Sequence, residues 1–208
     1  MSTSPAFADA AETWNRRYAS ADYLFGTEPN AWLREHATAL PAAGRVLSVA
    51  DGEGRNSVWL ARQGFQVDAF DVADRAVEKA QALARREGVS VNYTLADVDG
   101  FAWSDAAYDG VVAIFVQFAD PEIRARLFQR MVRSLKPGGV LILQGYTPKQ
   151  LEYRTGGPSV LSHLYSRQML ESAFVELSIL ELREYEREVQ EGQGHSGRSA
   201  LIGLVARR

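Results

Sequence analysis

The chain has 208 residues, 46% of them hydrophobic and 24% charged, with a formal net charge of −3 at pH 7, enough for one domain with a sizeable core. The mildly acidic charge argues against a dedicated nucleic-acid surface, and the absence of cysteine excludes disulfides, thiolate chemistry and cysteine-based zinc sites. No apolar run is long enough to span a membrane and no signal-like segment opens the chain, so we expect a cytoplasmic protein.

The first 44 residues are predicted to be helical and to lie outside the main core. An alanine-rich helix is expected over residues 6–21, and a second helix is expected to begin near Pro29 or Asn30. Between and within them is a dense set of aromatic residues: Trp14, Tyr18, Tyr23, Phe25 and Trp32. Two interpretations stay open and are compatible: these side chains pack on the sheet, or they form a lid over a ligand.

A strand, a glycine turn and a helix follow. Residues 46–50 are a short apolar run that predicts a buried strand. The turn Asp51-Gly52-Glu53-Gly54 comes next, and Asn56 is expected to cap a helix through residues 58–61. This order opens nucleotide-binding α/β units, because glycines admit a ligand close to the backbone and the helix start offers free N–H groups. A tight turn needed only for geometry is the competing interpretation.

The middle of the chain continues the alternation of strands and helices. Strands are expected over residues 66–70, 89–95, 108–115 and 140–143, with apolar helical stripes at 73–84 and 123–135. The second stripe carries four arginines that we expect on a solvated face rather than in a phosphate site: Arg124, Arg126, Arg130 and Arg133.

The last quarter breaks this alternation. A long loop over residues 145–158, a short helix at 166–173, a charged extended segment at 175–189 and a strand at 200–206 predict an antiparallel hairpin. The fold class is therefore α/β: a doubly wound, mostly parallel, seven-stranded Rossmann-like sheet. We expect a single domain, with residues 1–44 as a helical cover and 45–208 as the core.

Ligands of such sheets bind outside the carboxyl ends of the strands. Asp71 ends the second strand about 20 residues beyond the glycine turn, where a carboxylate can accept hydrogen bonds from ribose hydroxyls. That spacing suits an NAD-type and an adenosine-type cofactor equally. Asp51 and Glu53 would oppose a pyrophosphate, and Ser57 stands where the dinucleotide fingerprint has its third glycine. These details favour S-adenosylmethionine.

The motifs together resemble class I S-adenosylmethionine-dependent methyltransferases; they are residues 52–57, 67–71, 96–98 and 135–139. Within that class, residues 52–57 are similar to the tellurite-resistance methyltransferases and related bacterial proteins. Segments 14–18 and 23–30 resemble the N-terminal cover of that group and, more distantly, of thiopurine methyltransferases. Two positions depart from the pattern: Ala50 replaces a usual glycine, and Gln117 stands where a histidine is common.

The resemblance implies S-adenosylmethionine as cofactor and S-adenosylhomocysteine as its product. Asp71 would bind the ribose hydroxyls, Asp97 the adenine amino group and Val98 the face of the ring. Asp97 has a competing structural role as a cap after its strand. The full set of cofactor-binding residues implied is Ala50, Asp51, Gly52, Gly54, Asn56, Asp71, Val72, Asp97, Val98, Phe115 and Tyr23.

Methyl transfer from a sulfonium needs alignment of the acceptor more than a fixed catalytic group. His195, in a glycine-rich turn, is the candidate base, with a surface-loop histidine as the alternative. Tyr18 is the second candidate at the reaction centre, and Tyr153 and Arg187 are expected to shape the acceptor pocket. His36 and His163 are expected to be surface or packing residues, and the scattered histidines predict no metal site.

The predicted function is methyl transfer to a small-molecule acceptor such as a thiol, a chalcogen oxyanion or an amine. We expect a monomer or homodimer that binds no nucleic acid or membrane. The alternatives are an NAD(P)-dependent oxidoreductase and a protein that binds S-adenosylmethionine without catalysis.

Overall fold

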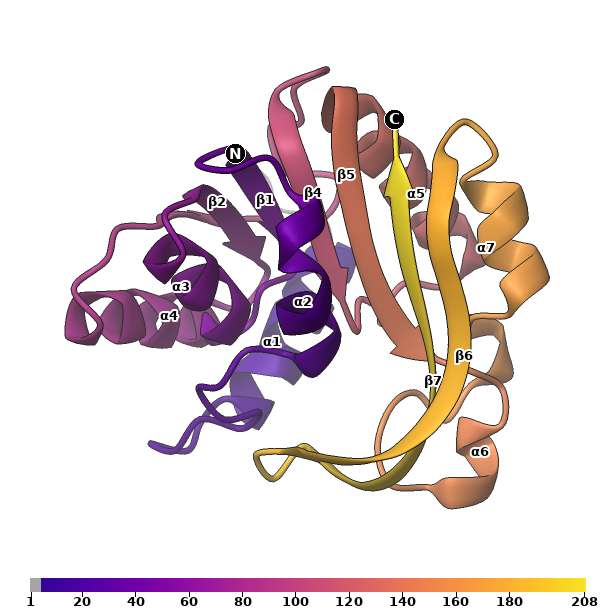
Figure 1. Ribbon diagram of the computed structural model, residues 1–208. Helices are drawn as coiled ribbons and strands as arrows, with labels where there is room; N and C mark the ends of the chain where they lie inside the picture. The colour runs from indigo at the N-terminus through magenta and orange to yellow at the C-terminus, as the bar shows by residue number, and fades with distance from the viewer. Residues whose placement is uncertain (1–4) are drawn as a thin grey trace.

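A single seven-stranded sheet organises the computed structural model, which describes residues 5–208 (Figure 1). The strand order is β3-β2-β1-β4-β5-β7-β6. The first five strands pair in parallel, and β7 runs antiparallel to both β5 and β6, as predicted. The strands are β1 Arg45–Val49, β2 Gln66–Asp71, β3 Asn92–Leu95, β4 Tyr108–Ile114, β5 Leu135–Tyr146, β6 Ser178–Glu191 and β7 His195–Arg207.

Helices cover both faces of the sheet; Figure 1 shows α2 in front of it and α5 behind it. On one face, Phe128 of α5 and Phe174 beside α7 complete a core that is closed to solvent. On the other, Trp32 of α2 and Leu60 of α3 are fully buried against the strands. The helices are α1 Pro5–Arg17, α2 Ala31–His36, α3 Arg55–Arg62, α4 Asp74–Arg86, α5 Pro121–Ser134, α6 Gln150–Tyr153 and α7 Arg167–Ala173, with 3₁₀ turns at Ala37–Ala39 and Leu161–His163.

Helix α5 begins at a strong cap. Asp120 Oδ1 accepts hydrogen bonds from the amides of Glu122 and Ile123, both at 2.9 Å, and Pro121 occupies the first helical position. Two of its arginines form ion pairs: Arg126 and Arg130 both pair with Asp99. The solvated basic face therefore carries ion pairs. No helix within residues 5–208 is both long and apolar enough to cross a membrane.

Several elements begin or end away from their predicted positions. Asn56 does not cap α3, because Gly54 takes the N-cap position with a φ of +93°. The Asn56 side chain instead accepts a hydrogen bond from the Asn30 amide at 3.0 Å, which anchors the segment before α2. Strand β5 starts directly where α5 ends, at Leu135, and the expected loop at 145–158 contains α6.

The β6–β7 hairpin is longer than predicted, and its tip lies beside the N-terminal segment (Figure 1). The Leu24 carbonyl accepts hydrogen bonds from the amides of Gln193 and Gly194, both at 2.9 Å. Gly194 is needed there, since an added Cβ would lie 2.3 Å from the Phe25 ring. His195 is consequently the first residue of β7 rather than part of a loop, a correction to the sequence prediction.

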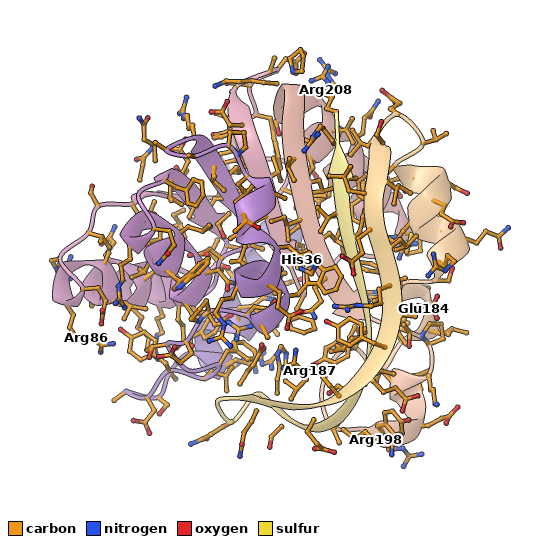
Figure 2. The ribbon with its side chains drawn as sticks, viewed as in Figure 1. His36, Arg86, Glu184, Arg187, Arg198 and Arg208 are labelled. Atoms are coloured by element: carbon orange, nitrogen blue, oxygen red, sulfur yellow. The ribbon has the colours of Figure 1, made fainter. Side chains whose placement is uncertain are left out.

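Strand β6 is the outer strand, and Figure 2 shows Glu184 and Arg187 as charged side chains on it. Arg187 pairs with Glu35 of α2 at 3.6 Å, and the Tyr153 hydroxyl donates to Glu186 at 2.6 Å. Neither Arg187 nor Tyr153 is among the residues that line the cavity described below, so the structure gives no support to the prediction that they shape an acceptor pocket.

Candidate functional site

A cavity of about 740 Å³ lies at the carboxyl ends of the central strands, under the N-terminal segment. Its walls come from the turn after β1, the ends of β2 and β3, the loops after β4 and β5, α1 and the start of β7. This is the edge of an open α/β sheet where ligands bind. The N-terminal aromatic residues divide between two places, since Tyr18 and Phe25 line the cavity while Trp32 is buried against the sheet as one interpretation predicted.

The turn after β1 has a strained backbone where it meets the cavity. Gly52 has a φ of +64°, and an added Cβ there would lie 3.1 Å from the Tyr18 hydroxyl. Ala50 has a φ of +46°, a conformation that costs a residue with a side chain about 1 kcal/mol or more. This conformation explains why a glycine is usual at the Ala50 position.

The two acids of the turn, Asp51 and Glu53, both form hydrogen bonds within the protein. The Asp51 carboxylate accepts hydrogen bonds from the Ser48 hydroxyl at 2.6 Å and the Ser57 amide at 3.2 Å, and it also binds the Ser57 hydroxyl. Burial raises the pKa of Asp51. Glu53 turns away from the cavity, binding the Leu24 amide at 2.7 Å and pairing with Lys79. Of the two acids expected to face a ligand, only Asp51 lines the cavity.

Asp71 stands at the end of β2 with 7% of its surface exposed. Its two carboxylate oxygens accept hydrogen bonds from the Gly52 amide at 2.8 Å and the Ala73 amide at 3.0 Å. Burial raises the pKa of Asp71 to about 6, although both hydrogen bonds favour its charged form. Because each carboxylate oxygen has a second lone pair, Asp71 can still accept two hydrogen bonds from a ligand in the cavity.

The segment after β3 forms the neighbouring wall. Asp97 accepts a hydrogen bond from the Gly100 amide at 2.6 Å, so it stabilises a turn while also lining the cavity. Val98 is buried, and its carbonyl accepts a hydrogen bond from the Trp103 indole at 2.8 Å. Asp97 caps no helix, because β4 is the next element after β3, and its turn-stabilising bond is compatible with a place in the cavity wall.

At the opposite end of the cavity, three rings pack around His195. Phe115 leaves β4 with a φ of +57° and stacks on Tyr146 with ring centres 4.7 Å apart. The His195 ring lies 4.6 Å from Phe115 and 4.5 Å from Phe25, and only 8% of the residue is exposed. A left-handed backbone at a bulky residue is strained and is characteristic of functional sites.

Behind His195 lies a buried ion pair that the sequence did not reveal. Glu191 pairs with Arg55 at 2.8 Å, accepts a hydrogen bond from the Asn30 side chain at 2.9 Å, and lies 3.4 Å from His195 Nδ1. Burial raises the pKa of Glu191, but His195 and Arg55 outweigh it and bring that pKa to about 2. Burial also lowers the pKa of His195, which Glu191 only partly offsets. A neutral imidazole beside an ionised carboxylate follows from these directions.

Tyr18 lies between these two ends, buried and stacked on Trp14 with ring centres 5.6 Å apart. Burial raises the pKa of Tyr18 well above its usual range, and the nearby Asp71 and Glu53 raise it further. Its hydroxyl therefore stays protonated and can donate a hydrogen bond but cannot act as a base near neutral pH.

Most of the predicted site residues share the cavity, and two do not. Gly54 lies outside its wall, where an added Cβ would be 2.8 Å from Ala80 of α4. Tyr23 is also outside, with its hydroxyl donating to the Lys79 carbonyl at 3.1 Å. The predicted residues that line the cavity are Tyr18, Ala50, Asp51, Gly52, Asn56, Asp71, Val72, Asp97, Val98, Phe115 and His195.

Comparison with known proteins agrees with this geometry. Residues 46–139 match a family model described as a methyltransferase domain. An uncharacterized protein of Mycobacterium tuberculosis is 32% identical over 142 residues, which is 66% of this chain and 51% of that protein. A thiopurine S-methyltransferase of Legionella pneumophila is 24% identical over 200 residues, 88% of each chain. The chain spans about half the length of the first curated relatives that it matches, the mycobacterial proteins.

The fold has a solved counterpart in the N-methyltransferase NodS of Bradyrhizobium japonicum, whose structure is a complex with S-adenosylhomocysteine. The TM-score is 0.69 with 18% sequence identity, covering 96% of this chain and 98% of NodS. At that identity the likeness establishes the shared fold.

Proposed function

We propose that the chain is a class I S-adenosylmethionine-dependent methyltransferase and that it transfers a methyl group from S-adenosylmethionine to a small-molecule acceptor. The observation that carries this proposal is the buried Asp71 carboxylate, which lines the cavity beside Gly52 and keeps the capacity to accept ribose hydroxyls. When bound, S-adenosylmethionine supplies a methyl group that its sulfonium has already activated.

The cavity residues fit this cofactor in chemical type. Asp71 would bind the ribose, Asp97 and Val98 would bind adenine, and the turn from Ala50 to Gly52 would face the methionine portion. An NAD-type pyrophosphate fits poorly, because Asp51 is an acid in the wall and already binds the Ser57 amide at the start of α3. This occupied amide favours S-adenosylmethionine over the oxidoreductase alternative.

The first 44 residues would act as the cover of a single catalytic domain. Tyr18 and Phe25 line the cavity, and Leu24 is bonded to the β6–β7 turn on one side and to Glu53 on the other. A cover held by both walls can exclude water and fix the acceptor's position, the main requirements of methyl transfer.

His195 is the proposed proton acceptor for a thiol or amine. Because a carboxylate only accepts hydrogen bonds, Glu191 favours the tautomer with hydrogen on Nδ1 and a lone pair on Nε2. The lone pair of Nε2 would take up the acceptor's proton during methyl transfer. A chalcogen oxyanion would need no such base, and Tyr18 would then contribute by hydrogen-bond donation alone.

Two measurements test this proposal in sequence. Titration calorimetry should show binding of S-adenosylmethionine and S-adenosylhomocysteine and no comparable binding of NADH or NADPH. Transfer of a labelled methyl group to thiols, selenols, tellurite and amines should then identify an acceptor class. Preferential nicotinamide binding would contradict the proposal, and tight S-adenosylmethionine binding with no transfer to any acceptor would favour the non-catalytic alternative.

A further inference from the structure

His163, expected to be a surface or packing residue, lies in the cavity wall and is locked in place by Gln117. The two residues bind each other reciprocally: His163 Nδ1 lies 3.0 Å from the Gln117 carbonyl, and the Gln117 side-chain amide donates to the His163 carbonyl at 3.0 Å. Gln117 is 3% exposed, and its remaining bonds, at 2.9 and 2.6 Å, hold the backbone of Tyr146.

These two hydrogen bonds, called the Gln117–His163 clamp below, fix the tautomer of the His163 ring. A backbone carbonyl can only accept a hydrogen bond, so Nδ1 must carry the hydrogen and the neutral ring presents the lone pair of Nε2. Within residues 5–208 the structure gives Nε2 no protein partner. Gln117 therefore fixes an oriented hydrogen-bond acceptor in the cavity wall, instead of supplying a base itself.

The wall around His163 is apolar and open to solvent. Phe118 and Val160 both line the cavity, and 39% and 51% of their surfaces are exposed. The cavity residues that the loops after β4 and β5 contribute here carry no charge; they are Gln117, Phe118, Gly157, Pro158, Ser159, Val160 and His163. An apolar ligand would cover the exposed hydrophobic surface of this wall.

We infer that His163 binds the methyl acceptor, which has an apolar body resting on Phe118 and Val160 and an N–H, O–H or S–H group that donates to Nε2. This inference rests on the proposed function, because it identifies the ligand of this wall as the acceptor. It assigns His163 to binding and selection, leaving proton removal to His195.

Imidazole nitrogen spectra of the ¹⁵N-labelled full chain test the inference with and without S-adenosylhomocysteine. The probes are three matched pairs in which one member lacks the donor: phenol and anisole, thiophenol and thioanisole, aniline and N,N-dimethylaniline. His163 should show only the Nδ1–H tautomer when neutral. Donor members should shift its Nε2 resonance and bind about threefold to tenfold more tightly than their capped partners, as one hydrogen bond allows.

Three variants separate binding from structure. His163→Phe keeps a ring and should abolish the preference for donors, whereas His36→Phe is the control, since His36 bonds to Glu181 of β6 away from the cavity. Phe118→Ala should weaken both members of a pair equally.

Several results would overturn the inference: an Nε2–H tautomer, equal binding of capped and donor probes, no donor that shifts His163, or a donor preference that survives in His163→Phe. The proposed function fails separately, when calorimetry detects no binding of S-adenosylhomocysteine to the wild-type chain. The His163 tautomer and the preference for donor probes are also measured without S-adenosylhomocysteine. These two results therefore test the inference whether or not the cofactor binds.

Discussion

The two ends of the cavity are built in different ways. The end assigned to the cofactor comes from one stretch of chain between Ser48 and Val98, in which Asp51, Asp71 and Asp97 lie at or just after the ends of parallel strands. The end assigned to the acceptor joins residues from distant positions, such as Phe25, His163 and His195.

Different forces hold these two ends. At the cofactor end, parallel pairing of β1 with β2 brings Asp71 to the glycine turn through local geometry. At the acceptor end, one buried ion pair joins Arg55 and Glu191 across 136 residues, and the Leu24 carbonyl holds the tip of the hairpin. Mutations in the β6–β7 hairpin should leave the cofactor end intact, whereas they should disrupt the acceptor end.

The largest expected effect is the loss of the Arg55–Glu191 pair. Glu191→Ala leaves the Arg55 guanidinium buried without its partner, and we expect it to lower the free energy of unfolding by about 3–5 kcal/mol. Urea denaturation measures this. Glu171→Ala is the control, because its pair with Arg167 is half exposed and should contribute less than about 1 kcal/mol. Equal losses in the two variants would mean that the buried pair does not hold the acceptor end.

Next comes His195→Ala, which should lower kcat about 10²-fold for a thiol or amine acceptor. Cofactor affinity should change little, since His195 lies at the end opposite Asp71. Steady-state kinetics together with calorimetry separate the two quantities. Full activity with a protonated acceptor would remove His195 from the reaction and leave it as part of the aromatic packing around Phe115.

A smaller effect is expected from Asp71→Ala, which should weaken S-adenosylmethionine binding about tenfold or more, through loss of charge-assisted hydrogen bonds worth about 1.5–3 kcal/mol. The control is Asp74→Ala, at the start of α4 and outside the cavity wall. An unchanged dissociation constant in Asp71→Ala would overturn the assignment of the cofactor end.

The smallest expected effect is the pH dependence of cofactor affinity in the wild-type chain. With a pKa of about 6, Asp71 is ionised at pH 8 and mostly protonated at pH 5. Affinity for S-adenosylhomocysteine should therefore fall as the pH drops through about 6, by up to about tenfold per unit below that value. Asp71→Asn should flatten this dependence. A wild-type affinity that is constant from pH 5 to pH 8 would show that the charge of Asp71 does not act in binding.

The same contrast explains what the sequence could predict. Apolar runs and glycine turns located the strands, and the positions of Asp71 and Asp97 followed because parallel strands end at one edge of a sheet. His195 was identified as a candidate, but its place in β7 was not, because the pairing of Glu191 with His195 depends on a tight turn that closes against Leu24.

Residues with no local pattern could not be found from the sequence at all. Arg55 and Glu191 look like ordinary charged residues, and the Gln117–His163 clamp forms only when the loops after β4 and β5 meet. Glu53 was expected to face a ligand, but its carboxylate pairs with Lys79 of α4, a contact that forms only when the two segments pack together.

Hydrogen exchange with and without S-adenosylhomocysteine tests the central claim most directly, because it reports on the cavity and its cover in one experiment. We predict that the cofactor protects the turn at residues 50–54 and the cover at residues 18–26 more than it protects the outer helix α7. Equal exchange in both segments, with and without a cofactor that calorimetry shows to be bound, would contradict a cavity closed by the N-terminal cover.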